Sequence, residues 1–148
     1  LATGSTVTGN LQISGPSSYS VGPNVTVVGN LQIQNIPIGS GTNQVCGTTV
    51  QHGNLTLTNS GVATQIGSTS NYVCPGNSVS GNLTVQSNPA QTSADSNSVG
   101  GNLVDQNNTG ATSVFSNTIH SNLQCTGNSS ITGGGNTAHA KTGQCAAF

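Results

Sequence analysis

Very few residues of this sequence carry side chains that can do chemistry. The 148-residue chain has two carboxylates, Asp95 and Asp105, one cation, Lys141, and a net charge of −1. About a quarter of the residues of an ordinary protein are charged. The surface of this protein must instead be hydrated through Asn, Ser, Thr, Gln and Gly. Without a basic stripe to hold phosphates, the chain is not expected to bind nucleic acid.

A pair of carboxylates suits glycoside hydrolysis, but this pair is not expected to meet. Asp95 ends the segment 88–95, which we predict to be a loop, whereas Asp105 falls at a core position of a strand. The sequence contains no Gly-x-Ser-x-Gly, P-loop or Gly-x-Gly-x-x-Gly motif. It has no Trp, two Tyr and two Phe, which leaves little aromatic surface for sugars. We therefore expect no enzyme and no cofactor.

The histidines are the remaining candidates for metal chemistry. His120 and His139 are placed by the sequence in one outward column, about one repeat apart, and His52 is a third candidate for that column. Two stacked imidazoles suit a soft divalent metal. The favoured interpretation is exposed surface histidines, and His120 and His139 are kept only as weak metal candidates.

An internal repeat positions all of these residues. Gly-Asn-Leu recurs at Gly9-Asn10-Leu11, Gly29-Asn30-Leu31, Gly53-Asn54-Leu55, Gly81-Asn82-Leu83 and Gly101-Asn102-Leu103, followed by the variant Ser121-Asn122-Leu123. The leucines are spaced 20, 24, 28, 20 and 20 residues apart. The unit is therefore 20 residues, and two coils carry about four and eight extra. A degenerate last copy, 136–139, resembles 117–120.

Around each motif the apolar residues alternate with period two, which is the pattern of a β-strand. Three inward columns follow: Val7, Val27, Val50, Val79, Val99 and Ile119; Leu11, Leu31, Leu55, Leu83, Leu103 and Leu123; and Ile13, Ile33, Leu57 and Val85, then Asp105 and Cys125. Further inward candidates are Val21, Ile36, Ile38, Val62, Ile66, Val114 and Ile131.

The fold class predicted from this pattern is all-β. Frequent Gly and Pro and the β-branched residues exclude helix. The chain has no Asn-Gly dipeptide, which argues against a meander of hairpins, and the strict period argues against a disordered linker. We predict a single domain over residues 1–148, a parallel β-solenoid (β-helix) of six to seven coils with about 20 residues each.

Stacked coils give the asparagines a role. We predict that Asn10, Asn30, Asn54, Asn82, Asn102 and Asn122 form a ladder at one corner, each amide bonding to its neighbours. The preceding Gly is expected to let the backbone bend there. An outward hydroxyl ladder is also predicted, made of Thr6, Thr26, Thr49, Ser78, Ser98 and Thr118. The extra residue in 50–53 is expected to form a β-bulge.

The cysteines fit the same register. Cys125 and Cys145 are one 20-residue coil apart, and Cys46 and Cys74 are 28 residues apart, which matches the longest coil. Each pair is therefore expected to lie on adjacent rungs and to form a disulfide. The alternative is four free thiols or a metal site, but no Cys-x-x-Cys spacing supports zinc. Disulfides indicate a compartment outside the reducing cytosol.

Asp105 is the one charged residue expected in a core column, between Val85 and Cys125. If it is buried, it must be protonated or locally hydrogen-bonded. The alternative is a local twist of the strand that exposes it to water.

Three segments also carry a resemblance to a known group. The runs 117–125, 132–137 and 143–145 (Asn-Thr-Ile-His-Ser-Asn-Leu-Gln-Cys, Thr-Gly-Gly-Gly-Asn-Thr and Gly-Gln-Cys) are similar to secreted bacterial Gly-Asn-Leu repeat proteins. The resemblance extends over nearly the whole chain at the level of the repeat. It implies export and a parallel β-helix, and it transfers no catalytic residues.

The function expected from these patterns is structural. Neither end of the solenoid carries a charge cluster or other guard, and the sequence ends in apolar Ala146-Ala147-Phe148. A start at Leu1 without Met suggests a mature, secreted form. We expect an extracellular or cell-surface protein that associates end to end with itself as a filament or surface-layer subunit. No apolar run is long enough to span a membrane.

Two other functions remain open at this point. The first is ice binding through the outward Thr/Ser ladder, although the neighbouring outward columns are mixed in composition. The second is an adhesin or matrix module, for which contact with a cell surface or a polysaccharide is a candidate interaction. The sequence does not separate an adhesive module from a self-assembling subunit.

Overall fold

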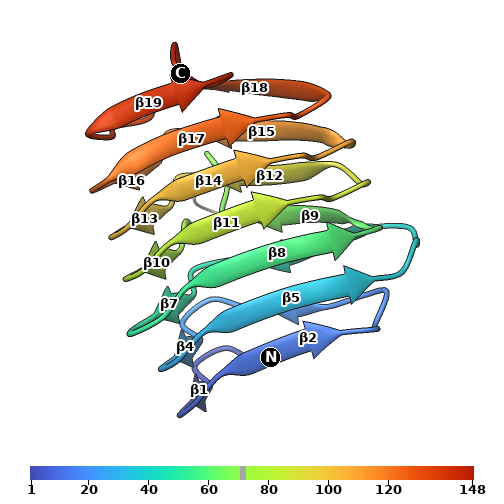
Figure 1. The fold of residues 1–148 in the computed structure, drawn as a ribbon. Coiled ribbons are helices and arrows are strands. Elements are labelled where there is room, and N and C mark those ends of the chain that lie inside the picture. The colour runs from blue at the N-terminus through green and yellow to red at the C-terminus, as the bar shows by residue number, and fades with distance from the viewer. Residues whose placement is uncertain (71–72) are drawn as a thin grey trace.

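The computed structural model describes residues 1–70 and 73–148 and shows a parallel β-solenoid of about seven turns (Figure 1). Each full coil contributes one strand to each of three parallel sheets, so strands that lie side by side are about one repeat apart in the sequence. The described residues contain no helix. The predicted fold class is confirmed.

The first sheet is built from very short strands. It has six strands of two residues each: β1 (Thr6–Val7), β4 (Thr26–Val27), β7 (Thr49–Val50), β10 (Ser78–Val79), β13 (Ser98–Val99) and β16 (Thr118–Ile119). An isolated bridge between Thr118 and Thr137 extends it into the last coil. The degenerate last repeat therefore pairs as the sequence indicated.

The second and third sheets have longer strands. The second sheet comprises β2 (Leu11–Ser14), β5 (Leu31–Ile36), β8 (Leu55–Ser60), β11 (Leu83–Gln86), β14 (Leu103–Gln106), β17 (Asn122–Thr126) and β19 (Ala140–Gly143). The third comprises β3 (Ser20–Val21), β6 (Thr42–Val45), β9 (Ala63–Ile66), β12 (Thr92–Asp95), β15 (Ala111–Phe115) and β18 (Ser130–Gly134).

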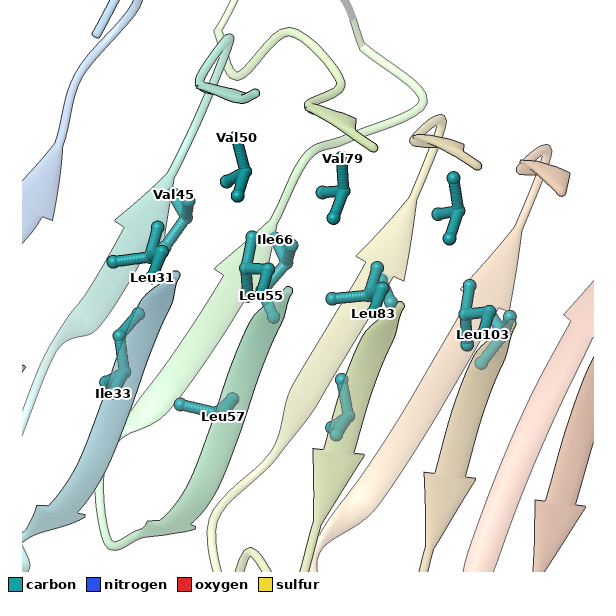
Figure 2. Close-up of a cluster of buried hydrophobic side chains, with 14 of the residues drawn as sticks. Leu31, Ile33, Val45, Val50, Leu55, Leu57, Ile66, Val79, Leu83 and Leu103 are labelled. Carbon is teal, nitrogen blue, oxygen red and sulfur yellow. The ribbon is translucent and has the colours of Figure 1, made fainter. Parts of the chain in front are cut away.

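The strand register confirms the three predicted inward columns. Val27 pairs with Val50, Leu55 with Leu83, and Val85 with Asp105. Figure 2 shows Leu31, Leu55, Leu83 and Leu103 in a row, one from each coil, with Val50 and Val79 beside them. These side chains are almost completely buried, so each coil covers the apolar residues of the next.

The extra residues of the longer coils lie at the corners. Segment 37–41 connects β5 to β6, and the described residues 67–70 and 73–77 lie between β9 and β10. The prediction that Ile38 points inward is wrong: its side chain is 89% exposed because the inserted residues lift it away from the coil. The extra residue of 50–53 lies in the turn between β7 and β8, outside both strands, so it is not a bulge within a strand.

The corner between the second and third sheets requires one unusual backbone conformation. In each of the first six coils, the fourth residue after the repeat leucine has φ between 53° and 88°; these residues are Gly15, Asn35, Asn59, Ser87, Asn107 and Gly127. Gly and Asn adopt this left-handed conformation at the least cost. The sharp bend of the coil is therefore encoded at a fixed position of the repeat.

Candidate functional site

The four cysteines form two disulfides between neighbouring coils, as predicted. Cys46 and Cys74 have Cα atoms 4.8 Å apart, and their bond ties segment 73–77 to the preceding coil. Cys125 and Cys145 have Cα atoms 5.4 Å apart, and their bond fixes the last residues of the chain to the sixth coil. No cysteine is free for metal binding or catalysis.

The predicted asparagine ladder is present at the corner between the first and second sheets. The backbone N–H of each Asn donates to the Oδ1 of the Asn in the preceding coil, at 2.7–3.0 Å, throughout the series Asn10, Asn30, Asn54, Asn82, Asn102 and Asn122. The ladder thus joins six coils through side chains, beside the backbone pairing of the sheets.

Close approach between coils requires the glycine before the ladder asparagine in the second to fifth coils, at Gly29, Gly53, Gly81 and Gly101. A Cβ at Gly81 would lie 2.5 Å from Asn54 Oδ1 and 2.7 Å from the Gly53 carbonyl oxygen. The backbone at this glycine does not adopt positive φ, so the predicted reason, freedom to bend, is wrong. Where Ser121 replaces the glycine, its N–H donates to the Gly101 carbonyl at 3.3 Å, against 2.9 Å for Gly101 to Gly81. A side chain at this position therefore separates the coils.

Two further asparagine ladders were not recognised in the sequence. One contains Asn77, Asn97, Asn117 and Asn136, and the other contains Asn88, Asn108 and Asn128; all seven are buried. Their Nδ2 groups donate to main-chain carbonyls, for example Asn97 to Ile66 at 3.0 Å and Asn117 to Ala94 at 2.8 Å. The signal that could have found them is their fixed offset within the repeat, two residues before the Val column and five residues after the Leu column.

The buried ladders run in the opposite sense to the exposed one. The N–H of Asn77 donates to Asn97 Oδ1 in the following coil at 2.9 Å, whereas the N–H of Asn30 donates to Asn10 Oδ1 in the preceding coil at 2.8 Å. In the buried ladders the side-chain amide therefore satisfies an N–H and a carbonyl of the preceding coil, as Asn117 does with the N–H of Asn97 and the carbonyl of Ala94. In the exposed ladder Oδ1 likewise accepts from a main-chain N–H, whereas the Nδ2 groups of Asn30 and Asn54 contact only the preceding Oδ1.

Asp105 is buried in the core, with 1% of its surface exposed. Its Oδ1 accepts hydrogen bonds from Asn108 Nδ2 at 3.0 Å and from Thr112 Oγ1 at 3.4 Å. Desolvation by burial raises the pKa of Asp105 to about 6, and the side-chain hydrogen bonds oppose this rise. Of the two predicted alternatives, burial with local hydrogen bonds is confirmed, and exposure through a twisted strand is not found.

Asp105 adjoins an inward polar column that the sequence analysis missed. Asn43, Thr64, Thr92 and Thr112 pair in register on the third sheet, and all four are buried. The Thr64 hydroxyl lies 3.2 Å from the Ser60 hydroxyl. The interior is therefore apolar between the first and second sheets and partly polar where the third sheet faces it.

The remaining titratable residues do not converge. Asp95 ends strand β12 and is half-buried, so its predicted loop position is wrong; its Oδ1 accepts from the Phe115 N–H at 2.9 Å, and burial raises its pKa. His120 and His139 are exposed on adjacent coils, and the N–H of His139 pairs with the Ser121 carbonyl. Among the described residues there is no group of three or more His, Cys, Asp or Glu that could hold a metal.

The two ends of the solenoid differ. In the first coil Val7, Leu11 and Ile13 are half-exposed, whereas their equivalents in the second coil are completely buried. In the described part of the chain, β1, β2 and β3 each pair on one side only. The first coil therefore presents an apolar surface and, along β1 and β2, free backbone donors and acceptors, while the Leu1 ammonium group donates to the Ser20 carbonyl of β3.

The last coil is covered, which corrects the expectation that neither end is guarded. Lys141 takes the place of the repeat leucine opposite Leu123, and its Nζ donates to the Phe148 carbonyl oxygen. The ring of Phe148 fills the space where Gly133 lacks a side chain, since a Cβ there would lie 2.2 Å from the ring. The apolar tail thus folds over the end of the core and is held there by the Cys125–Cys145 disulfide.

Comparison with protein-family models, with curated proteins and with solved structures finds no match for this chain. In the described residues no helix is long and apolar enough to cross a membrane. What the structure shows is therefore the fold: a repeat-built solenoid with two disulfides, three asparagine ladders and an almost uncharged surface.

Proposed function

We propose that this protein is an extracellular structural protein that assembles with copies of itself, end to end, as a filament or surface-layer subunit. Its coils already stack on one another through backbone hydrogen bonds and apolar columns, and a second copy can continue the same contacts. No catalytic role is proposed, because the carboxylates Asp95 and Asp105 lie in different sheets and each is bonded to its own neighbours.

The observation that carries the proposal is the state of the first coil. Its half-exposed Val7, Leu11 and Ile13 end three core columns, and no charged residue lies among the first 94 positions to repel a partner. Strand edges in monomeric proteins are normally protected by charge, bulges or proline within the strand. Strands β1 and β2 contain none of these.

The residues that cover the last coil form the second surface of the proposed contact. Ala146 and Ala147 are exposed, and Phe148 is half-buried against the core. These residues present an apolar surface to the apolar first coil of the next copy. Strand β18 also keeps one unpaired edge in the described part of the chain, so backbone hydrogen bonds add to this contact.

Two disulfides support the extracellular location, because such bonds persist in oxidising compartments. The resemblance to secreted bacterial Gly-Asn-Leu repeat proteins agrees with it. Secretion would also explain how a chain of net charge −1 avoids contact with the crowded, charged interior of a cell.

Ice binding is the second candidate, and one observation favours it. The hydroxyl ladder Thr6, Thr26, Thr49, Ser78, Ser98 and Thr118 pairs in register along the first sheet. Strands of that sheet have only two residues, however, so the sheet carries a single outward column of this kind. An ice plane needs at least two matching columns, and an adhesin or matrix module remains the third candidate.

Negative-stain microscopy of the purified chain tests the proposal directly. Fibres or regular arrays are expected at high protein concentration. Dispersed single particles at every concentration would contradict self-assembly and would favour the ice-binding or adhesive alternatives.

A further inference from the structure

A polar groove runs along the exposed asparagine ladder over the first three coils. It has a volume of about 350 Å³ and is lined by Asn10, Leu11, Gln12, Asn30, Leu31, Gln32, Asn54 and Thr56. One wall carries the ladder amides, and the other carries the next outward column of the second sheet.

The amides in this groove have unused hydrogen-bonding capacity. Asn30 Nδ2 and Asn54 Nδ2 make only long contacts with the preceding Oδ1, at 3.3 and 3.4 Å. In the buried ladders, by contrast, Nδ2 donates to a main-chain carbonyl, for example Asn77 to Val45 at 2.9 Å. The ladder asparagines are exposed at coils one to three and half-buried at coils four to six. The ladder amides are therefore most accessible to a ligand where the groove lies.

The opposite wall supplies acceptors and hydroxyls in the same register. Gln12 pairs with Gln32, and Gln32 pairs with Thr56, so one polar side chain from each coil faces the ladder. Gln32 uses its Nε2 to donate to Gln34 at 2.9 Å, which leaves its Oε1 available. Each coil thus offers a donor and an acceptor to a ligand lying parallel to the solenoid axis.

Charge defines the class of ligand that this groove suits. No Asp, Glu, Lys or Arg occurs before Asp95 in the sequence, so no ionic partner is present to attract or repel a charged group. Amide and hydroxyl rows without charge match a neutral molecule that carries many hydroxyl groups. The coils repeat about every 4.8 Å, which is close to the advance per sugar of an extended β-linked glycan.

We propose that this groove binds a neutral, linear, β-linked polysaccharide that lies along the solenoid axis, with successive sugars contacting successive coils. The groove lies along the side of the solenoid but begins in the first coil, where Leu11 also belongs to the stacking surface. Its residues Gln32 and Thr56 lie in the second and third coils, so they test the groove separately from self-assembly. The groove contains no aromatic ring, so binding to a single copy is weak. Assembly of several copies would strengthen binding by multivalency.

Fluorescence anisotropy with labelled hexasaccharides tests this site. The probes are cellohexaose and hexa-N-acetylchitohexaose, which are neutral, and hexamannuronate, which is anionic and also β-linked. The protein should bind at least one neutral probe in the millimolar range or tighter and should bind hexamannuronate more weakly. Absence of binding to both neutral probes, or a preference for the anionic probe, would overturn the proposal.

A matched pair of double variants locates the site. Gln32→Ala with Thr56→Ala removes two groove side chains, and Gln124→Ala with Thr84→Ala removes the same two residue types from the same outward column at other coils. The groove variant should bind about tenfold more weakly, as expected for two lost hydrogen bonds, while the control keeps parental affinity. Equal affinities of the two variants, with both folded by circular dichroism, would refute the assignment.

Discussion

Asp105 Oδ1 accepts a hydrogen bond from Asn108 Nδ2 at 3.0 Å, inside a core in which the residues before and after Asp105 in its column are Val85 and Cys125. The carboxyl of Asp105 is almost completely shielded from water and faces no cation. Its environment therefore favours the neutral acid over the carboxylate. The folded protein is therefore less stable when this carboxyl is ionised.

The protein is predicted to be more stable in acid than at neutral pH. The folded-state pKa of Asp105 is raised from 3.8 to about 6, so the folded state holds a proton that the unfolded state has released. The stabilisation that this proton provides is fully present below pH 3.8 and is lost as the pH rises from 3.8 to about 6. Above about pH 6, Asp105 no longer makes the free energy of unfolding depend on pH. The loss amounts to at most about 3 kcal/mol. Urea unfolding between pH 3 and 8 measures it.

Asp105→Asn should remove most of this pH dependence, because an amide resembles the protonated acid and does not titrate. Asp95→Asn is the matched control: its raised pKa acts in the same direction, but it is only half-buried and should change the profile less. A parent whose free energy of unfolding rises from pH 4 to pH 7 would show that Asp105 is not buried as described.

Leu83→Asn should destabilise the middle coils. Leu83 is completely buried between Leu55 and Leu103, so the change removes apolar contacts and strands an amide without partners. The cost should be about 3–5 kcal/mol. Thr84→Asn is the control, since Thr84 is the half-exposed neighbour on the same strand. Melting temperatures of the two variants should differ clearly, and equal values would mean that Leu83 is not inward.

Gly81→Ala should destabilise the solenoid, whereas Gly9→Ala should not. A Cβ at Gly81 would meet Asn54 Oδ1 at 2.5 Å, but nothing among the described residues lies within 4 Å of one at Gly9. Forced separation of two coils should cost about 1–3 kcal/mol. Chemical denaturation of both variants provides the comparison. A Gly81→Ala variant as stable as the parent would contradict close approach at this corner.

Much of the fold could be predicted from the sequence, because stacking repeats each local environment once per coil. A residue such as Leu83 is specified by its own alternation pattern and by Leu55 and Leu103 above and below it. The disulfides followed from the same register, since Cys125 and Cys145 differ by one coil. Even the inward position of Asp105 was readable, because its column contains Val85 and Leu57.

What could not be predicted is the structure that departs from the repeat. Ile38 continues the alternation that begins at Ile36, but three-dimensional placement of the inserted loop takes it into solvent. Phe148 covers Gly133 because the chain turns back after β19, and no earlier coil contains an equivalent turn. The groove along Asn10, Asn30 and Asn54 likewise depends on the depth of a corner, which residue spacing does not specify.

Self-assembly through the terminal coils is the central claim, and its contact is predicted to be apolar. Val7→Lys combined with Ala138→Lys adds one charge to the first coil and a second, besides Lys141, to the last coil; both substituted side chains are half-buried. The double variant should stay monomeric with its middle coils folded, because an ammonium group would be desolvated in the contact. Thr84→Lys, on the side of the solenoid, is the matched control and should assemble as the parent does.

Sedimentation velocity of the unmodified chain over a wide range of concentrations, in low salt and in high salt, tests this claim most directly. We expect large species whose amount rises with concentration and is unchanged by salt, since charge plays little part in the contact. A chain that sediments as a monomer at every concentration in both salts would contradict it.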